Sequence, residues 1–291
     1  MEIIHEPDLG ALTTLGLGGK ALALVRPSTC EDLANLQDVC TSFGGTPYVL
    51  GRGSNILARD GHLPYVLVQA DFKAKPMILK ETQDQAWVKV GAGVSLPKFV
   101  KYCASEGLAG LEGLVGIPGS VGGAVAMNAG SFGSETCAAV TELEIWQESQ
   151  LKTLTPKDFS YAYRAFILRA APENFLILNV TFGLRKAERH CIFRTMDLNF
   201  LNKKSRQPIT ARSAGCVFKN PPAGPSAGYL LEAAGFKGKS LGGVAFSNLH
   251  ANFLLNVDHG TSSEALTLIE AAKEKVLQLF QVQLEPEVRI I

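Results

Sequence analysis

Apolar residues change their spacing twice along the first fifth of the chain. Residues 21–28 open with a run of apolar side chains, as in a buried strand, and residues 31–44 carry apolar side chains at helical spacing. Residues 46–57 form a second apolar run that includes the glycine-rich stretch 51–55. The pattern predicts strand, helix and strand, a small α/β unit that ends in a turn.

The spacing then becomes the alternation that is typical of strands. Three runs rich in β-branched and aromatic residues, 65–72, 76–83 and 86–93, predict a strand-rich region. Further along, strands predicted at 140–149, 150–156 and 174–185 surround a predicted loop at 158–167.

Between these two strand regions, a helix is predicted at 95–107, with Ser95 as its N-cap and Gly107 as its stop. It leads into a run with glycine at every third position, namely Gly107, Gly110, Gly113, Gly116, Gly119 and Gly122, followed at once by Gly123. The run is too short and too poor in proline for a collagen helix. Two readings stay open: turns and caps that require glycine, or backbone N–H groups that close around an anion.

The last third of the chain predicts a connector and a smaller domain. Residues 188–208 form a polar, partly helical connector. Helices are predicted at 227–235 and 262–280, the second capped by Ser262 or Ser263, and 282–291 is predicted as a terminal strand. The chain therefore divides into a larger N-terminal α+β part and a smaller C-terminal domain.

Composition narrows the functional classes. The chain has 291 residues, of which 46% are hydrophobic and 19% charged, and a net charge of +1. This balance lacks the excess of positive charge that is typical of proteins that bind nucleic acid or an anionic membrane. The N-terminal residues lack a basic leader, and no apolar run is long enough to span a membrane. We therefore expect a globular cytoplasmic protein.

The six cysteines do not form a metal-binding pattern. They show neither C-x-x-C pairs nor the histidine spacing of a zinc site, and they are Cys30, Cys40, Cys103, Cys137, Cys191 and Cys216. We expect no metal, and we expect most of the thiols to be reduced and buried as small apolar side chains.

Several motifs resemble known sites but lack the required context. Residues 233–240 fit a relaxed phosphate-loop pattern, yet a predicted helix rather than a strand precedes them, with Gly235 as its C-cap. Residues 15–20 and 49–57 fall short of a dinucleotide fingerprint. His250 is read as a structural histidine. What remains is a set of glycine- and asparagine-rich loops at 51–55, 117–130 and 213–221 that can converge on a ligand with a diphosphate.

At these residues the sequence resembles the UDP-N-acetylenolpyruvoylglucosamine reductases, flavoenzymes of peptidoglycan precursor synthesis. The matching stretches follow the family's order over nearly the whole chain: 13–19, 50–57, 107–133, 161–164, 213–221, 250–256 and 284–291. The chain resembles the shorter of the family's two types, which lacks an extra substrate-capping insert.

The resemblance implies an α+β fold. A two-subdomain FAD-binding module of the vanillyl-alcohol-oxidase type would precede a C-terminal α/β substrate-binding domain. The implied boundaries are 1–64 and 65–186 for the two FAD-binding subdomains and 187–291 for the substrate domain.

The resemblance also implies a reaction. NADPH reduces FAD, and hydride then passes to the enolpyruvyl methylene carbon, which leaves UDP-N-acetylmuramate. An Arg, a Ser and a Glu act in the family, and by motif they fall on Arg164, Cys216 and Glu287. A cation and a hydrogen-bonding acid aimed at the substrate carboxylate would stabilise the charge that develops on it. Without the resemblance, Arg164 and Glu287 would be read as ordinary ion-pair residues.

Cys216 departs from the family, which usually has Ser at this position. A thiol is a stronger acid than an aliphatic hydroxyl, so Cys216 can still donate the proton that the reaction needs.

The remaining assignments also come from the resemblance. FAD would be held by Gly51, Arg52, Gly53, Ser54, Asn55, Ile56, Ile117, Pro118, Gly119, Ser120, Gly122, Gly123, Asn128, Ala129, Gly130 and Arg289. The nucleotide-sugar substrate would face Tyr163, Lys219 and Asn220. Backbone N–H groups at 117–123 would contact the phosphates. Small molecules are the only partners expected, and the chain is expected to be a monomer.

Two alternative functions remain besides the one that the resemblance implies. One is another flavin-dependent oxidoreductase on the same cofactor fold. The other is a flavin- or nucleotide-sugar-binding protein without catalysis, which the replacement of Ser by Cys makes conceivable.

Overall fold

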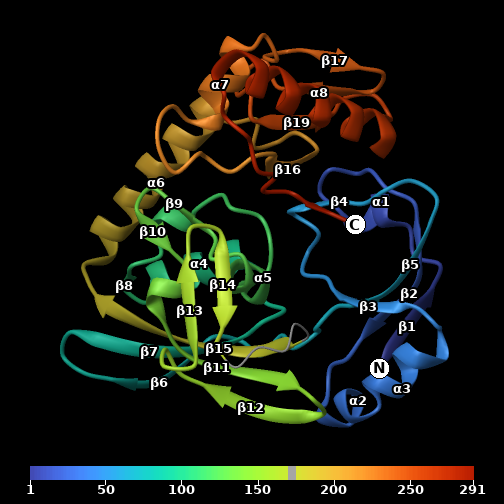
Figure 1. The fold of residues 1–291 in the computed structure, drawn as a ribbon. Coiled ribbons are helices and arrows are strands. Elements are labelled where there is room, and N and C mark those ends of the chain that lie inside the picture. The colour runs from blue at the N-terminus through green and yellow to red at the C-terminus, as the bar shows by residue number, and fades with distance from the viewer. Residues whose placement is uncertain (170–174) are drawn as a thin grey trace. The chain divides into compact units, whose positions relative to one another are not determined.

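The structure is a computed structural model that describes residues 1–169 and 175–291 (Figure 1). The chain forms two compact units, each built from several segments. The first unit comprises 1–4, 23–51 and 66–202, and the second comprises 5–22, 52–65 and 203–291. Helices and strands are mixed in both units, which confirms the expected α+β class.

A six-stranded antiparallel sheet forms the centre of the first unit. Its order is β12-β11-β15-β7-β6, with β8 also paired to β15. These strands are β6 (Met77–Glu81), β7 (Gln85–Gly91), β8 (Leu108–Ala109), β11 (Val140–Gln147), β12 (Gln150–Leu154) and β15 (Leu176–Lys186). The predicted strands at 76–83, 86–93, 140–149, 150–156 and 174–185 are thereby confirmed, apart from residue 174, which lies outside the described residues.

Two helices bury their apolar faces on this sheet. Phe99 of α4 (Leu96–Ser105) contacts Phe182 of β15, with ring centroids 4.9 Å apart, and both rings are fully buried. Ser95 is the N-cap of α4 and Gly107 follows its end with a φ of 71°, as predicted. The short α5 (Val121–Ala126) lies against β7 and β15.

Short elements connect these helices and strands. They are the 3-10 turns η1 (Glu112–Leu114) and η2 (Cys137–Ala139) and the strands β9 (Gly130–Ser131), β10 (Ser134–Glu135), β13 (Phe159–Ala162) and β14 (Ala165–Leu168). Strands β13 and β14 form an antiparallel hairpin, so the prediction of a loop at 158–167 was wrong. Phe159 and Phe166 pack across it, with ring centroids 5.1 Å apart.

A four-stranded sheet of order β1-β2-β5-β3 contains the strands of the first α/β segment. Its strands are β1 (Glu2–His5), β2 (Lys20–Arg26), β3 (Thr46–Val49) and β5 (His62–Val68). The helix predicted at 31–44 is two helices, α2 (Cys30–Ala34) and α3 (Leu36–Ser42), which meet at Asn35. Their buried Leu33 and Cys40 pack with Val25 and Val66 of the sheet.

The second unit contains an antiparallel sheet of order β16-β19-β18-β17 and two helices, of which α8 lies against β17 and β18 and α7 packs on α8 (Figure 1). The strands are β16 (Ser213–Cys216), β17 (Ser240–Leu241), β18 (Val244–Phe246) and β19 (Phe253–Asn256). The helices are α7 (Ala227–Ala233) and α8 (Ser262–Phe280), as predicted. Further elements are α1 (Leu9–Leu12), β4 (Ile56–Leu57) and β20 (Arg289–Ile290), with β20 parallel to β4.

Three local predictions need correction. The N-cap of α8 is Thr261, not Ser262 or Ser263, because Thr261 has extended backbone and forms a capping box with Glu264. The predicted terminal strand is regular only at Arg289–Ile290. The connector is one long helix, α6 (Arg189–Arg206), rather than a partly helical segment.

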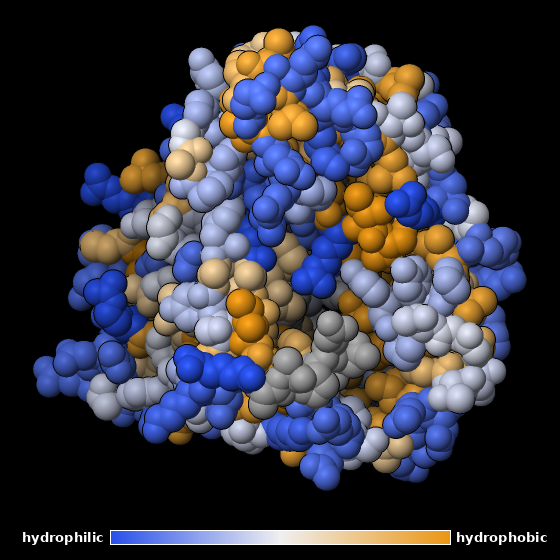
Figure 2. Space-filling view, viewed as in Figure 1, coloured by the Kyte–Doolittle hydropathy of each residue, from blue (hydrophilic) through white to orange (hydrophobic). Residues whose placement is uncertain are grey.

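The surface mixes polar and apolar residues. Figure 2 shows hydrophilic and hydrophobic residues interspersed over the face in view. On α6, Leu198 and Leu201 remain about 60% exposed, while Ile192 and Met196 are buried. Within residues 1–169 and 175–291, no helix has the length and apolar character needed to cross a membrane.

Candidate active site

The period-three glycine run has two structural causes rather than one. Gly119 has a φ of 135°, a backbone conformation that side chains rarely adopt, and Gly107, Gly110 and Gly116 also have positive φ. Gly122 instead permits close packing, because a Cβ there would lie only 2.8 Å from the Cβ of Ala92. The regular spacing therefore combines turn residues with points of close contact.

The start of α5 determines which backbone N–H groups can meet an anion. The N–H of Gly122 donates to the Ala92 carbonyl at 2.9 Å, and the N–H of Gly123 donates to Ser120 Oγ at 3.3 Å. In the part of the chain that the structure describes, the N–H groups of Gly119 and Ser120 donate to no protein atom. These two adjacent donors next to a positive-φ glycine form a turn suited to a phosphate.

Two of the predicted loops meet within the first unit. A Cβ on Gly51 would lie 3.3 Å from Ser120 Oγ and 3.7 Å from Gly123 Cα, so the beginning of the 51–55 loop contacts the turn before α5. Gln69 holds this position by donating from Nε2 to the Gly51 carbonyl at 2.6 Å. Ile117 and Pro118 precede the turn, and the Ile117 N–H donates to the Leu114 carbonyl.

Asn128 is buried and both ends of its amide are engaged. Its Nδ2 donates to the Ala162 carbonyl at 2.9 Å, and its Oδ1 accepts from the Cys137 N–H at 3.0 Å. Ala129, the next residue, accepts from Thr136 through its carbonyl. Gly130 begins β9, where a Cβ would overlap the Ser134 carbonyl. The side chain of Asn128 thus fixes the end of β13, directly before Tyr163 and Arg164.

Tyr163 and Arg164 form the two-residue turn of the β13–β14 hairpin. Arg164 has a φ of 57°, a left-handed conformation that hairpins usually give to Gly or Asn. Its guanidinium carbon lies 5.0 Å from the centroid of the Tyr163 ring. A strained cationic residue at a hairpin tip is a feature that clusters at functional sites.

In the second unit, Arg52–Ile56 continue the first glycine-rich loop. Gly53 has a φ of 64°, and a Cβ there would overlap the Leu12 carbonyl. Asn55 Nδ2 donates to the Glu287 carbonyl at 3.0 Å, and the Asn55 carbonyl accepts from the Arg289 N–H at 3.0 Å. Asn55 therefore holds the terminal segment that carries Glu287. Arg52 is exposed, Ser54 is half-buried, and Ile56 is buried and pairs with Arg289.

Cys216 and Glu287 lie on two segments that are joined through Val217. Cys216 ends β16 after a bulge at Gly215, whose φ is 81°. The Val217 carbonyl accepts from the Glu287 N–H at 2.7 Å and from the Val288 N–H at 3.3 Å. The structure thus brings Cys216 and Glu287 onto adjoining segments of the second unit, whereas Arg164 belongs to the first unit.

Lys219 and Asn220, two of the residues expected at the nucleotide sugar, come shortly after Cys216 in the chain. Lys219 donates its N–H to the Glu285 carbonyl at 2.9 Å, and its ammonium lies 3.5 Å from the Glu285 carboxylate. Asn220 Oδ1 accepts from the Ala227 N–H at 3.0 Å, at the start of α7. Asn220 therefore has a structural contact through one end of its amide.

The cysteines differ in their environments. Cys40, Cys103 and Cys137 are buried, Cys30 and Cys191 are exposed, and Cys216 is half-buried, so the expectation that most are buried was wrong. Burial raises the pKa of the Cys137 thiol to about 12 and raises the pKa of Cys103 as well. These buried thiols are therefore poor acids and nucleophiles at neutral pH.

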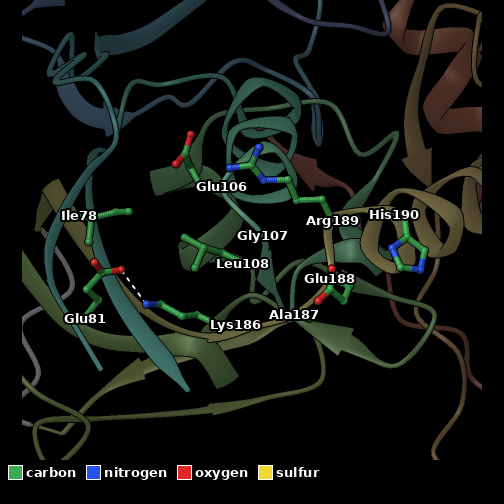
Figure 3. A pocket seen from close by; sticks show the side chains of 10 residues that line it. All are labelled: Ile78, Glu81, Glu106, Gly107, Leu108, Lys186, Ala187, Glu188, Arg189 and His190. Carbon is green, nitrogen blue, oxygen red and sulfur yellow. Dashed lines mark ion pairs between the residues drawn. The ribbon is translucent and has the colours of Figure 1, made fainter. Parts of the chain in front are cut away.

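A cavity of about 600 Å³ lies elsewhere in the first unit (Figure 3). Ile78 and Leu108 contribute apolar walls, and Lys186 pairs with Glu81 at 2.8 Å. None of the residues expected to bind flavin or substrate lines it. Among the described residues, no cluster of three or more His, Cys, Asp or Glu side chains is arranged to hold a metal ion.

The chain matches known proteins over its whole length. Residues 207–291 match the family described as UDP-N-acetylenolpyruvoylglucosamine reductase, C-terminal domain, and residues 21–149 match the FAD binding domain family. A UDP-N-acetylenolpyruvoylglucosamine reductase of Nitratidesulfovibrio vulgaris is 46% identical, and the match covers 100% of this chain and 99% of that protein. One from Syntrophus aciditrophicus is 36% identical and covers 99% and 92%.

A solved structure agrees with these matches. The crystal structure of UDP-N-acetylenolpyruvylglucosamine reductase from Thermus caldophilus superimposes with a TM-score of 0.83 at 33% identity. The superposition covers 99% of this chain and 98% of that one. The chain belongs to the UDP-N-acetylenolpyruvoylglucosamine reductase family.

Proposed function

We propose that this protein catalyses the NADPH-dependent reduction of UDP-N-acetyl-enolpyruvoylglucosamine to UDP-N-acetylmuramate through bound FAD, a step of peptidoglycan precursor synthesis. The observation that carries this proposal is family membership over the full chain, with a relative that is 46% identical. Two observations are compatible with that chemistry: the joined segments of Cys216 and Glu287, and the N–H groups of Gly119 and Ser120, which donate to no protein atom among the described residues.

The residues of the first unit suit the pyrophosphate of FAD. The N–H groups of Gly119 and Ser120 are the donors, and Gly51 leaves room beside them. Gly122 acts by permitting close packing of α5 against Ala92, and the N–H groups of Gly122 and Gly123 are already bonded. When bound, FAD supplies two-electron chemistry by taking up hydride from NADPH and passing it to the substrate.

Arg164 and Glu287 act on the substrate carboxylate. Addition of hydride to the methylene carbon drives negative charge onto the adjacent carbon and its carboxylate. The planar guanidinium of Arg164 pairs with that carboxylate through two donors. Glu287, holding its proton, donates a hydrogen bond to it. Both contacts strengthen as charge develops, which is the requirement for lowering the barrier.

Cys216 completes the addition by protonating the adjacent carbon. Hydride and this proton together saturate the double bond, and the resulting thiolate recovers its proton from solvent. General acids in enzymes contribute about 10² to 10⁴ in rate. The family's usual Ser and the Cys of this chain both carry a transferable proton, so the replacement is compatible with turnover.

The remaining contacts bind the nucleotide sugar. Lys219 meets the diphosphate, Asn220 binds the substrate through its Nδ2, and Tyr163 packs beside Arg164 at the substrate. Arg289, Asn55 and Ile56 support the segment of Glu287 beside the flavin site. We assign residues 1–64 and 65–186 to the two FAD-binding subdomains and residues 187–291 to the substrate-binding domain.

One coupled assay tests the function. Purified protein should be yellow with a flavin spectrum and should oxidise NADPH only when UDP-N-acetyl-enolpyruvoylglucosamine is added. UDP-N-acetylmuramate should form in equal amount. A flavin spectrum with NADPH oxidation that ignores this substrate would indicate another oxidoreductase. Binding of the substrate without any NADPH oxidation would indicate a non-catalytic binding protein.

A further inference from the structure

Asn252 uses three of its four polar atoms to hold one stretch of backbone, Val217–Phe218. Its side chain is 2% exposed, and it precedes β19 in the second unit. Its Oδ1 accepts from the Phe218 N–H at 3.0 Å, and its Nδ2 donates to the Phe218 carbonyl at 2.8 Å. Its own carbonyl accepts from the Val217 N–H at 2.9 Å. Its N–H donates to His250 Nδ1 at 3.2 Å.

The stretch that Asn252 holds carries both Cys216 and Glu287. Cys216 directly precedes Val217 and pairs with Phe253, the residue after Asn252. On the other edge, the Val217 carbonyl accepts from the Glu287 N–H. One buried amide therefore sits opposite the point where the two segments join.

Apolar packing cannot replace this amide. Val217 and Phe218 are 3% and 1% exposed, and their side chains pack in the core of the second unit. Such packing is not directional and does not fix where a main-chain N–H or carbonyl points. A bulge at Gly215 and irregular pairing at 287–288 also leave this region without a continuous strand ladder. The Asn252 amide supplies the missing directional contacts.

We propose that Asn252 is a positioning residue for the reaction, which fixes the main chain of Cys216 and Glu287 relative to one another. The inference rests on the proposed function for its kinetic consequence. Asn252 itself touches no reacting atom. It acts through Val217 and Phe218, and its loss lets the proton donor and the acid drift out of register.

Asn256, the last residue of β19, provides a matched control four positions further along the chain. Its Nδ2 donates to the Gly16 carbonyl at 3.0 Å, and its Oδ1 accepts from the Gly260 N–H at 3.0 Å. Asn256→Ala thus also removes a side-chain amide with two hydrogen bonds, but these bonds do not involve Val217 or Phe218. A merely structural role for Asn252 would make the two variants behave alike.

The kinetic experiment compares Asn252→Ala, Asn252→Asp and Asn256→Ala in single turnovers. For both Asn252 variants, transfer to the enolpyruvyl substrate should slow by about ten- to a hundredfold, the usual result of small misplacement. Reduction of the flavin by NADPH should keep its wild-type rate. Asn252→Asp keeps the shape and the acceptor, so it serves if the alanine variant does not fold. Equal slowing of both half-reactions, or equal effects in Asn256→Ala, would overturn the proposal.

Hydrogen exchange tests the positioning independently of activity. In Asn252→Ala or Asn252→Asp, the amide of Glu287 should exchange faster than in wild type, although Asn252 does not contact Glu287. In Asn256→Ala that amide should keep its wild-type exchange rate. An unchanged Glu287 amide in the Asn252 variants would refute the inference. If the wild-type protein failed the coupled assay while the exchange result held, the proposed function would be wrong and the positioning would stand.

Discussion

Gly122 offers a quantitative test of how the turn before α5 serves FAD. A Cβ at this position would lie 2.8 Å from Ala92 Cβ and 3.4 Å from the Ala92 carbonyl oxygen. Carbon atoms prefer roughly 3.5–4.0 Å, so Gly122→Ala must move the start of α5 by roughly 0.7 Å or more. Overpacking of this kind costs about 1–3 kcal/mol, and the better helix propensity of Ala offsets up to about 1 kcal/mol.

The same movement displaces the proposed phosphate donors. The N–H groups of Gly119 and Ser120 directly precede α5, and each hydrogen bond to a charged group is worth about 1.5–3 kcal/mol. Loss of one such bond weakens FAD binding by about tenfold or more. We expect this loss in FAD titrations of the apoprotein, followed by flavin fluorescence, and in the ratio of flavin to protein after gel filtration.

Two other glycines of the run serve as controls. A Cβ on Gly123 meets only Ser120 Oγ, at 3.2 Å, and a hydroxyl can rotate, so Gly123→Ala should bind FAD nearly as wild type. Gly110 has a φ of 126°, so Gly110→Ala should lower the melting temperature through backbone strain and leave FAD affinity unchanged. Equal losses of FAD affinity in all three variants would show that the glycines of the run serve packing alone and not FAD binding.

Further predictions concern stability. Burial raises the pKa of Asp60, but hydrogen bonds from the first residues of α8 outweigh burial, and the net pKa is lowered from 3.8. Asp60 therefore stabilises the folded protein above pH 3.8, and this stabilisation is lost as the pH falls below that value. Asp60→Ala should lower the free energy of unfolding, measured in urea at neutral pH, by about 1 kcal/mol. An equal decrease at low pH would contradict this role of Asp60. Burial lowers the pKa of His250 below 6.5, and its Nδ1 accepts from Asn252, while Glu232 raises the pKa and Lys237 lowers it. Stability should therefore fall as the pH drops below 6.5, and in His250→Gln the melting temperature should depend less on pH in this range. An unchanged pH dependence of the melting temperature would show that His250 is not its source. Arg164→Gly should relieve the left-handed strain and stabilise the protein by about 1 kcal/mol while abolishing turnover, and a destabilised variant would show that the turn is not strained.

The sequence predicts most of the regular elements because their signals are local. The apolar spacing of 262–280 locates α8 to the residue, and Gly107 and Gly235 end their helices with positive φ as expected. The cap of α8 was missed because Ser262, Ser263 and Thr261 are all good capping residues, and only the backbone angles select Thr261. The hairpin at 158–167 was missed because its four-residue strands are too short for a clear alternation.

The candidate site depends on contacts that no local pattern contains. Cys216 and Glu287 are 71 positions apart in sequence and meet through Val217, and their support by Asn252 comes from a third segment. The family resemblance supplied their roles, and it named the segment of Asn252 without giving that residue one. Asn55 and Asn128 were expected at the cofactor, yet their side chains hold the Glu287 segment and the Tyr163–Arg164 hairpin. A buried amide that orients backbone looks the same in sequence as one that binds a ligand.

The proposed role of Cys216 is tested most directly by a single turnover, in which enzyme reduced in advance with NADPH is mixed anaerobically with UDP-N-acetyl-enolpyruvoylglucosamine. Flavin absorbance is followed in the wild type, Cys216→Ser and Cys216→Ala. We predict that Cys216→Ala reoxidises about 10² to 10⁴ times more slowly than wild type. Cys216→Ser should restore much of the rate, and all three should accept hydride from NADPH equally well. A wild-type rate in Cys216→Ala would contradict the assignment of Cys216 as the proton donor.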